Sequence, residues 1–259
     1  MLCHVGGLLT IPVAVEQIFA YNPDATSESQ CDSVSAHLHE ILKHIGDDTP
    51  LPDSDDGVGV CLDLFFEKRM LMHLVRRAQS DTRTMMRVVL EATTQLLKST
   101  DIAMLPEASV HEPLSNLLSV SAKHARAALS DEDERSDSVA EAVVFLQLLN
   151  AVLEKIKQFP GSFVVLDPRG DLVNSVLHSA LSVAVECIRM PGTRAKLAIK
   201  VVNNCIEIIP LVDPFGSYFV NDLNFPKMLA EYLIELLCRL PQSIDVRSAF
   251  LCNIVLTAT

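Results

Sequence analysis

The sequence predicts an all-α fold, an α-solenoid-like stack of antiparallel helix pairs of the HEAT or armadillo kind. The clearest sign is the stretch 171–210, where apolar residues recur at helical spacing on both sides of a Met-Pro-Gly break at 190–192. The apolar faces are wider than one stripe, so we expect each helix to be buried on two sides. A second pair of the same layout occupies 60–98, with its turn at 80–81. Recurrence of such pairs is typical of helical-repeat proteins.

The composition agrees with a large helical core. The 259 residues are 49% hydrophobic but only 5% aromatic, and none is Trp, so we expect a core of Leu, Val, Ile and Ala. A chain of this length can bury roughly three quarters of its unfolded surface. We predict a single helical-repeat domain over 1–259.

Helical spacing places the individual elements. In chain order we expect helices at 11–20, 34–45, 60–77, 84–98, 114–129, 139–159, 172–188, 193–209, 227–240 and 245–259. Thr193 is expected to cap the helix that follows the 190–192 break, and Asp137 or Ser138 the helix that begins at 139. The residues 110–113 are expected to form a connector in which His111 bonds to the backbone and Pro113 fixes the start of the next helix.

Polar and irregular segments separate these helices. Two acidic stretches are expected on the surface, a linker at 46–59, in which 46–57 holds two Pro and five Asp, and a loop at 130–137. The irregular segment 211–226 is expected to cover the open edge of the stack. The last helix has no obvious polar cap, which predicts that the chain is the N-terminal part of a longer solenoid or caps against another protein.

Charge and cysteine usage exclude several classes of function. The formal net charge of −12 argues against a nucleic-acid surface, and basic or neutral protein partners fit better. The seven cysteines form no CxxC pair, so neither a zinc cluster nor a disulfide framework is predicted, and a reducing, intracellular compartment is expected. We predict neither a signal peptide nor a membrane span, so membrane association would require a partner.

Candidate chemistry is sparse. His37, Glu40 and His44 share one helical face at metal-ligand reach, but no fourth ligand is near, and a polar surface face is the preferred interpretation. A metal-dependent hydrolase using this face is the alternative. The acidic run 53–57 is similar to a calcium loop, yet Pro52 would occupy the first ligand position. Without a catalytic motif, we predict no enzyme activity and no cofactor.

Five arginines give the first helix pair a basic side on an otherwise acidic protein. They are Arg69, Arg76, Arg77, Arg83 and Arg87, and we refer to them as the arginine group. One interpretation is that they are solvated side chains that balance Glu67, Asp81 and Glu91. The other is a docking patch for a negatively charged partner.

Short motifs in a fixed order suggest a family. They are the segments 15–18, 61–66 with 70–71, 86–87, 105–106, 110–114, 155–160, 171–177, 192–195 and 240–243. In this collinear order they resemble the FTS-Hook-interacting protein family (FHIP), a subunit of the FHF complex. The Asp-Leu-Val-Asn-Ser-Val-Leu segment at 171–177 and the Val-His-x-Pro connector at 110–113 contribute most to the resemblance. The chain departs from the family pattern at Thr84, where Gly is usual, and it ends near the middle of a family protein.

The resemblance implies a helical-repeat adaptor and not an enzyme. Members of the family join Hook proteins and the ubiquitin-conjugating-like FTS protein, and they help to couple endosomal cargo to dynein, with early-endosome Rab GTPases as membrane-side contacts. A cytoplasmic protein that is peripheral on early endosomes is therefore expected. The alternative is a general α-solenoid adaptor unrelated to endosomes, for example in nuclear transport or phosphatase assembly.

Overall fold

The computed structural model describes residues 27–47, 58–80, 83–130, 136–162, 176–190 and 192–212, together with isolated positions between 216 and 234. Within the listed ranges all regular elements are helical and no strand occurs, which confirms the all-α prediction. The elements are α2 (Ser27–Gly46), α3 (Val60–Glu67), α4 (Met70–Ser80), α5 (Arg83–Ser99), α6 (Ala108–Ser130), α7 (Ser136–Gln158), the 3-10 turn η1 (Pro160–Ser162), α9 (Val176–Cys187) and α10 (Thr193–Ile208).

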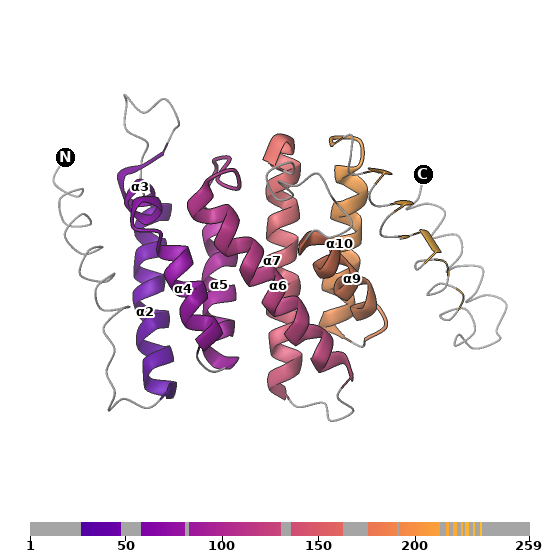
Figure 1. Cartoon of the computed structure of the whole chain (residues 1–259), viewed down its shortest axis with the longest axis horizontal. Helices are drawn as coiled ribbons and strands as arrows, with labels where there is room; N and C mark the ends of the chain where they lie inside the picture. Colours follow the sequence, from indigo (N-terminus) through magenta and orange to yellow (C-terminus); the bar gives the residue numbers. More distant parts are fainter. Residues whose placement is uncertain are drawn as a thin grey trace.

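The helices pack in two layers. In the first layer α2 packs against α5, α5 against α7, and α7 against α10, and Figure 1 shows these four helices upright and side by side. In the second layer α4 packs against α6 and α6 against α9, while the short α3 contacts α2, α4 and α6. Each of the pairs α4–α5, α6–α7 and α9–α10 bridges the two layers. From α4 to α10, successive described helices therefore alternate between the layers.

Side-chain contacts give the direction of the helices. Lys155, near the end of α7, donates to the carbonyl of Thr100, which directly follows α5. Lys157 of α7 pairs with Glu207 at the end of α10. The C-terminal ends of α5, α7 and α10 consequently lie together, so these helices run parallel within the first layer.

The second layer runs the other way. Arg126, near the C-terminal end of α6, pairs with Glu186 near the C-terminal end of α9, so these two helices are parallel to each other. His124 of α6 bonds to Glu141 in the first turns of α7, which makes α6 and α7 antiparallel. The two layers are thus oriented in opposite directions at this point.

A single cluster of buried apolar residues extends through all these helices, from Cys31 to Val212. As the composition predicts, Leu, Val, Ile and Ala supply most of it, with Phe145 among its largest fully buried side chains. Helix α7 lies between α5, α6 and α10, and for this reason its apolar residues extend around most of its circumference. The cysteines in the described part of the chain are buried, and none of them is in a disulfide; they are Cys31, Cys61, Cys187 and Cys205.

The predicted helix at 60–77 is wrong in one respect, because it is two helices. The chain turns at Lys68 and Arg69, where the Arg69 N–H bonds to the Phe66 carbonyl and Arg69 adopts a φ of 47°. Apolar spacing continues from α3 into α4, with Phe65 and Met70 both buried in the same core. Periodicity alone therefore gave no sign of the break.

The predicted connector at 110–113 is also wrong, because these residues lie inside α6. The helix begins at Ala108, and Pro113 is within it. Pro113 lacks an N–H group and cannot bond to the carbonyl of Ser109 one turn earlier, but it is close enough to the helix start for the helix to form around it. Two residues before Pro113, the main-chain N–H of His111 bonds to the Glu107 carbonyl oxygen in the first turn of this helix.

Other helix starts also differ from the predictions. The helix α2 begins at Ser27, seven residues before the predicted start at 34, and Cys31 in this added part is buried in the core. The helix α10 begins at Thr193, and its N-cap is Gly192, which has a φ of 73° and makes no side-chain bond, so Thr193 is not the cap. The helix α7 begins at Ser136, which places Asp137 and Ser138 inside its first turn. The predictions for 11–20, for most of the two acidic segments, for 211–226 and for the last two helices lie outside the described residues.

Candidate functional site

The arginine group is spread over two positions of the fold. Arg69 lies on the turn before α4, whereas Arg76 and Arg77 lie near the other end of α4, about 10 Å further along its axis. Arg83 is the first residue of α5, and Arg87 lies one turn later. The α4–α5 end of the molecule thus brings together four of the five arginines, and Arg69 lies apart from them.

The environments of these arginines differ. Arg69 and Arg76 are exposed, and Arg77 and Arg87 are half-buried. Arg87 forms a pair with Glu91 one turn along α5, with Nε and Oε1 3.9 Å apart, while Glu67 pairs with Lys68 and not with an arginine. Exposed pairs of this kind contribute little to stability. Among Arg76, Arg77 and Arg87, which lie near the α4–α5 turn, Arg76 is the most exposed.

The histidine face on α2 has no metal geometry. His37, Glu40 and His44 all lie on this helix, but in the ranges that the structure describes no group of three His, Cys, Asp or Glu side chains is placed to hold an ion. The Nδ1 atom of His37 is 2.6 Å from the Ser33 carbonyl oxygen, so this nitrogen already has a partner. The structure gives no support to a metal-dependent hydrolase at this position.

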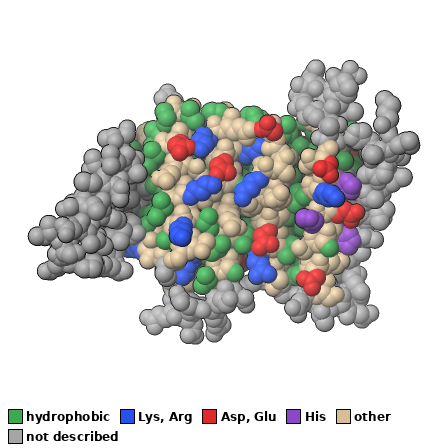
Figure 2. Space-filling model, turned by 180° about the vertical axis from the view of Figure 1, so that it is seen from behind, with side chains coloured by type: hydrophobic (Ala, Val, Ile, Leu, Met, Phe, Trp, Pro, Cys, Tyr) green, Lys and Arg blue, Asp and Glu red, His purple; other side chains and the backbone are tan. Residues whose placement is uncertain are grey.

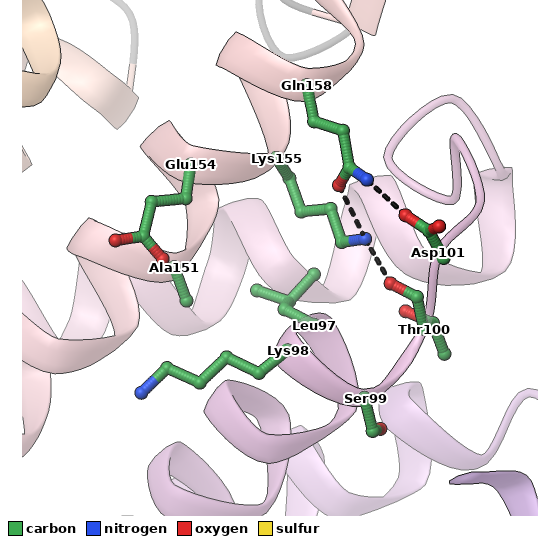
Figure 3. A pocket seen from close by; sticks show the side chains of 9 residues that line it. All are labelled: Leu97, Lys98, Ser99, Thr100, Asp101, Ala151, Glu154, Lys155 and Gln158. Atoms are coloured by element: carbon green, nitrogen blue, oxygen red, sulfur yellow. Dashed lines mark hydrogen bonds between the residues drawn. The ribbon is translucent and has the colours of Figure 1, made fainter.

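A cavity of about 260 Å³ lies between the C-terminal end of α5 and the last turns of α7. Leu97 and Ala151 are its deeply buried apolar members, and the remaining lining is polar or charged (Figure 3). Its lining residues are Leu97, Lys98, Ser99, Thr100, Asp101, Ala151, Glu154, Lys155 and Gln158. The sequence analysis did not predict this cavity, because it depends on how two helices about fifty residues apart pack.

Lys155 organises the polar side of this cavity. Its ammonium group is buried and donates to the Thr100 carbonyl and, over 3.1 Å, to Oε1 of Gln158. The amide of Gln158 in turn donates to the carboxylate of Asp101, as Figure 3 shows. Lys155 therefore caps the end of α5 from the neighbouring helix, and it satisfies a carbonyl group that the helix itself leaves without a partner.

The electrostatics of Lys155 follow from this position. Burial lowers the pKa of the Lys155 amine below its ordinary value, because the charged form loses water, and the nearby Asp101 carboxylate acts in the opposite direction. The ammonium nitrogen also lies 5.4 Å from the centre of the Phe159 ring. The lining of the cavity includes no His or Cys that could act with this amine in catalysis. Lys155 thus connects α7 to the end of α5 beside the cavity.

Other polar groups lie buried between helices, and sequence reasoning missed them. Glu141 is 4% exposed, and its Oε1 atom lies 2.9 Å from Nδ1 of His124, within hydrogen-bond distance. Asn150 of α7 and Asn204 of α10 are bonded to each other in the core. Their only sequence signal is a polar residue inside an otherwise apolar helix, which does not identify the partner.

The hydrogen bonds of His111 differ in part from those that the sequence predicts. Its Nδ1 atom is buried and has no hydrogen-bond partner among the described residues, as is also true of the Ser109 hydroxyl. Burial lowers the pKa of His111, opposed by the charge of Glu112. The main-chain N–H of His111 bonds to the backbone, at the Glu107 carbonyl, whereas its Nδ1 atom does not.

Comparison with known proteins adds no identification: no protein-family model matches the chain, and no curated protein sequence matches it. Among the described helices, none has both the length and the apolar character needed to cross a bilayer. The candidate sites of this protein are therefore defined by its own geometry, namely the arginine group and the α5–α7 cavity.

Proposed function

We propose that this protein is a non-enzymatic scaffold in which stacked helix pairs form an α-solenoid and present their outer faces to other proteins. The observation that carries the proposal is the parallel alignment of α5, α7 and α10, whose C-terminal ends lie together in one layer. Such an alignment arises when one helical hairpin is repeated with a constant translation. The opposite direction of α6 relative to α7 fits the same unit.

The family resemblance supplies the partners for this proposal. By that resemblance, the chain joins Hook-type dynein adaptors and an FTS-type protein to endosomal cargo, with an early-endosome Rab GTPase as a possible membrane-side contact. Its own place would be the cytoplasmic surface of early endosomes, held there through partners. The two-layer architecture of packed helices supports a binding role over an enzymatic one.

The arginine group supplies the first surface to test. We expect charge reversal at Arg76, Arg77 and Arg83 to weaken binding to a Hook-type or FTS-type protein without unfolding the chain, because Arg76 is exposed and Arg77 is not part of the apolar core. Co-precipitation of the wild type and the triple variant with each partner, alongside circular dichroism of both, measures this. Unchanged binding would remove the arginine group from the interface.

A separate measurement tests the endosomal role itself. Well-folded protein should recover Hook-type or FTS-type proteins from cell extract and co-localise with an early-endosome marker. Recovery of neither class would contradict the proposal. Binding to other proteins at a different location would favour a general α-solenoid adaptor unrelated to endosomes.

A further inference from the structure

Helix α10 has one apolar strip that the described helices do not cover. Ala198, Val201 and Val202 of α10 are buried, but Ile199 and Ile206 on the outer side are 45% and 50% exposed. These two residues lie seven positions apart, so they share one side of the helix at a separation of about 10 Å. Apolar residues at this spacing form the stripe that a helix normally buries against another helix.

Lysines surround this strip. Lys196 and Lys200 flank Ile199 in the sequence of α10, and both are exposed. Lys200 pairs with Glu154 of α7 over 2.6 Å, and Lys157 of α7 pairs with Glu207. The two glutamates on this face are thus neutralised by lysines of the neighbouring helix.

Two further lysines on this side leave a positive excess. In the part of the chain that the structure describes, neither Lys196 on α10 nor Lys98 on α5 forms an ion pair. Lys155 and Asp101, which lie deeper in the α5–α7 cavity, oppose each other's charge. A surplus of positive charge therefore remains on this face, although the whole chain has a net charge of −12.

The strip and the cavity form a continuous surface. Glu154 lines the α5–α7 cavity together with Lys98, and the same carboxylate bonds to Lys200 next to Ile199. The surface thus extends from Lys98, across α7, to the strip on α10. Figure 2 shows the molecule from this side, with Lys and Arg side chains distributed over the middle of the face between acidic and apolar ones.

We infer that this surface, from Lys98 to Ile206, docks an amphipathic helix of a partner protein that carries acidic side chains beside its apolar stripe. The apolar stripe would cover Ile199 and Ile206, and the acidic side chains would approach Lys98 and Lys196. A second copy of this chain fits less well, because two molecules of charge −12 repel each other. The inference adds a second surface to the adaptor proposed above and does not use the arginine group.

A designed peptide tests the inference on the whole chain. The probe is a fluorescein-labelled helix of about five turns, with Leu along one stripe and Glu on the flanking positions, and the comparison peptide has Lys in place of each Glu. Fluorescence anisotropy gives the Kd of each peptide. We expect the acidic peptide to bind at least about tenfold more tightly than the basic one, and its affinity to fall as salt is raised.

Variants locate the site. Reversal of charge in the double variant Lys98→Glu, Lys196→Glu should weaken binding of the acidic peptide about tenfold or more, and Ile199→Ser with Ile206→Ser should weaken it similarly. The control is Lys123→Glu, a charge reversal at one exposed position of α6 in the other layer, which should leave the Kd unchanged.

Two results would overturn the inference: equal affinity for the acidic and basic peptides, or an equal loss in the Lys123→Glu control. Either result would leave the proposed adaptor function intact if co-precipitation with Hook-type or FTS-type proteins succeeds. Conversely, peptide binding at this surface without such co-precipitation would support the surface and contradict the proposed partners.

Discussion

Asn204 of α10 donates a hydrogen bond of 3.0 Å from Nδ2 to Oδ1 of Asn150 on α7, and both side chains are 4% exposed. Asn150 also donates to the Leu146 carbonyl of its own helix and to the Leu197 carbonyl of α10. Two buried amides therefore connect neighbouring helices of the first layer. Such a connection fixes the register of one helix against the other, because any slip would leave buried polar groups without partners.

This connection predicts the effect of removing one partner. Asn204→Ala should lower the free energy of unfolding by about 1–3 kcal/mol, because the side-chain oxygen Oδ1 of Asn150 would stay buried without a donor. Urea unfolding measures the change. Asn203→Ala, at the exposed neighbouring position, serves as the control and should cost much less. A double-mutant cycle with Asn150→Ala that shows no coupling would contradict the assignment.

The contact between His124 and Glu141 gives a second prediction. Glu141 is almost fully buried, and His124 is its hydrogen-bond partner at 2.9 Å. His124→Ala should therefore lower the free energy of unfolding by about 2 kcal/mol, since it leaves a carboxylate buried without this partner. In the Glu141→Gln background the same histidine substitution should cost less, because no charge remains buried. Equal costs in the two backgrounds, measured by chemical denaturation, would argue against a charge-assisted contact.

The third prediction concerns the pH dependence that Lys155 confers. Burial lowers the pKa of its amine below the ordinary 10.5, so between the folded pKa and 10.5 the unfolded chain holds more protons than the folded one. Stability rises with pH wherever the unfolded state binds more protons. The cost of burying the charge is thus fully present below the folded pKa and is relieved as the pH approaches 10.5.

Two variants isolate this effect. Lys155→Met removes the titrating group, and we expect the stability of the wild type relative to this variant to increase as the pH is raised from about 7 to about 10. Lys155→Arg keeps a cation that does not titrate in this range, so the stability of this variant relative to Lys155→Met should not increase with pH. Denaturant midpoints at several pH values give the comparison, and a difference that stays constant with pH would refute it.

Gly192 gives the fourth prediction. It is the N-cap of α10 with a φ of 73° and a ψ of −135°, a conformation that residues with a Cβ atom rarely adopt. A Cβ added at this position would meet nothing within 4 Å, so the cost of Gly192→Ala comes from the backbone alone. We expect a loss of about 1–3 kcal/mol in thermal or chemical unfolding.

Gly161→Ala is the matched control for that substitution. Gly161 lies in η1, has no positive φ, and likewise has open space around an added Cβ atom. Its substitution should be close to neutral. Equal losses at the two positions would show that something other than the backbone conformation of Gly192 is responsible.

The helical class and the approximate positions of most helices can be predicted from the sequence alone. Helical periodicity depends on residues three and four positions apart, and this local pattern survives in α5, α7 and α10 within a few residues of the predicted bounds. The prediction of helix bounds is wrong where a local signal points to the wrong boundary or where no local signal marks it. Pro113 predicts a helix start, but it lies inside α6, and the turn at Arg69 interrupts no apolar pattern.

Contacts between residues far apart in the sequence depend on how the helices pack. The partners Asn150 and Asn204, Lys155 and Thr100, and Arg126 and Glu186 are all separated by more than fifty positions along the chain. Their proximity depends on the order in which the helices stack, and a one-dimensional pattern does not encode this order. For the same reason the α5–α7 cavity and the exposed strip at Ile199 and Ile206 could not be predicted, because burial on a helix is set by the neighbours that pack against it.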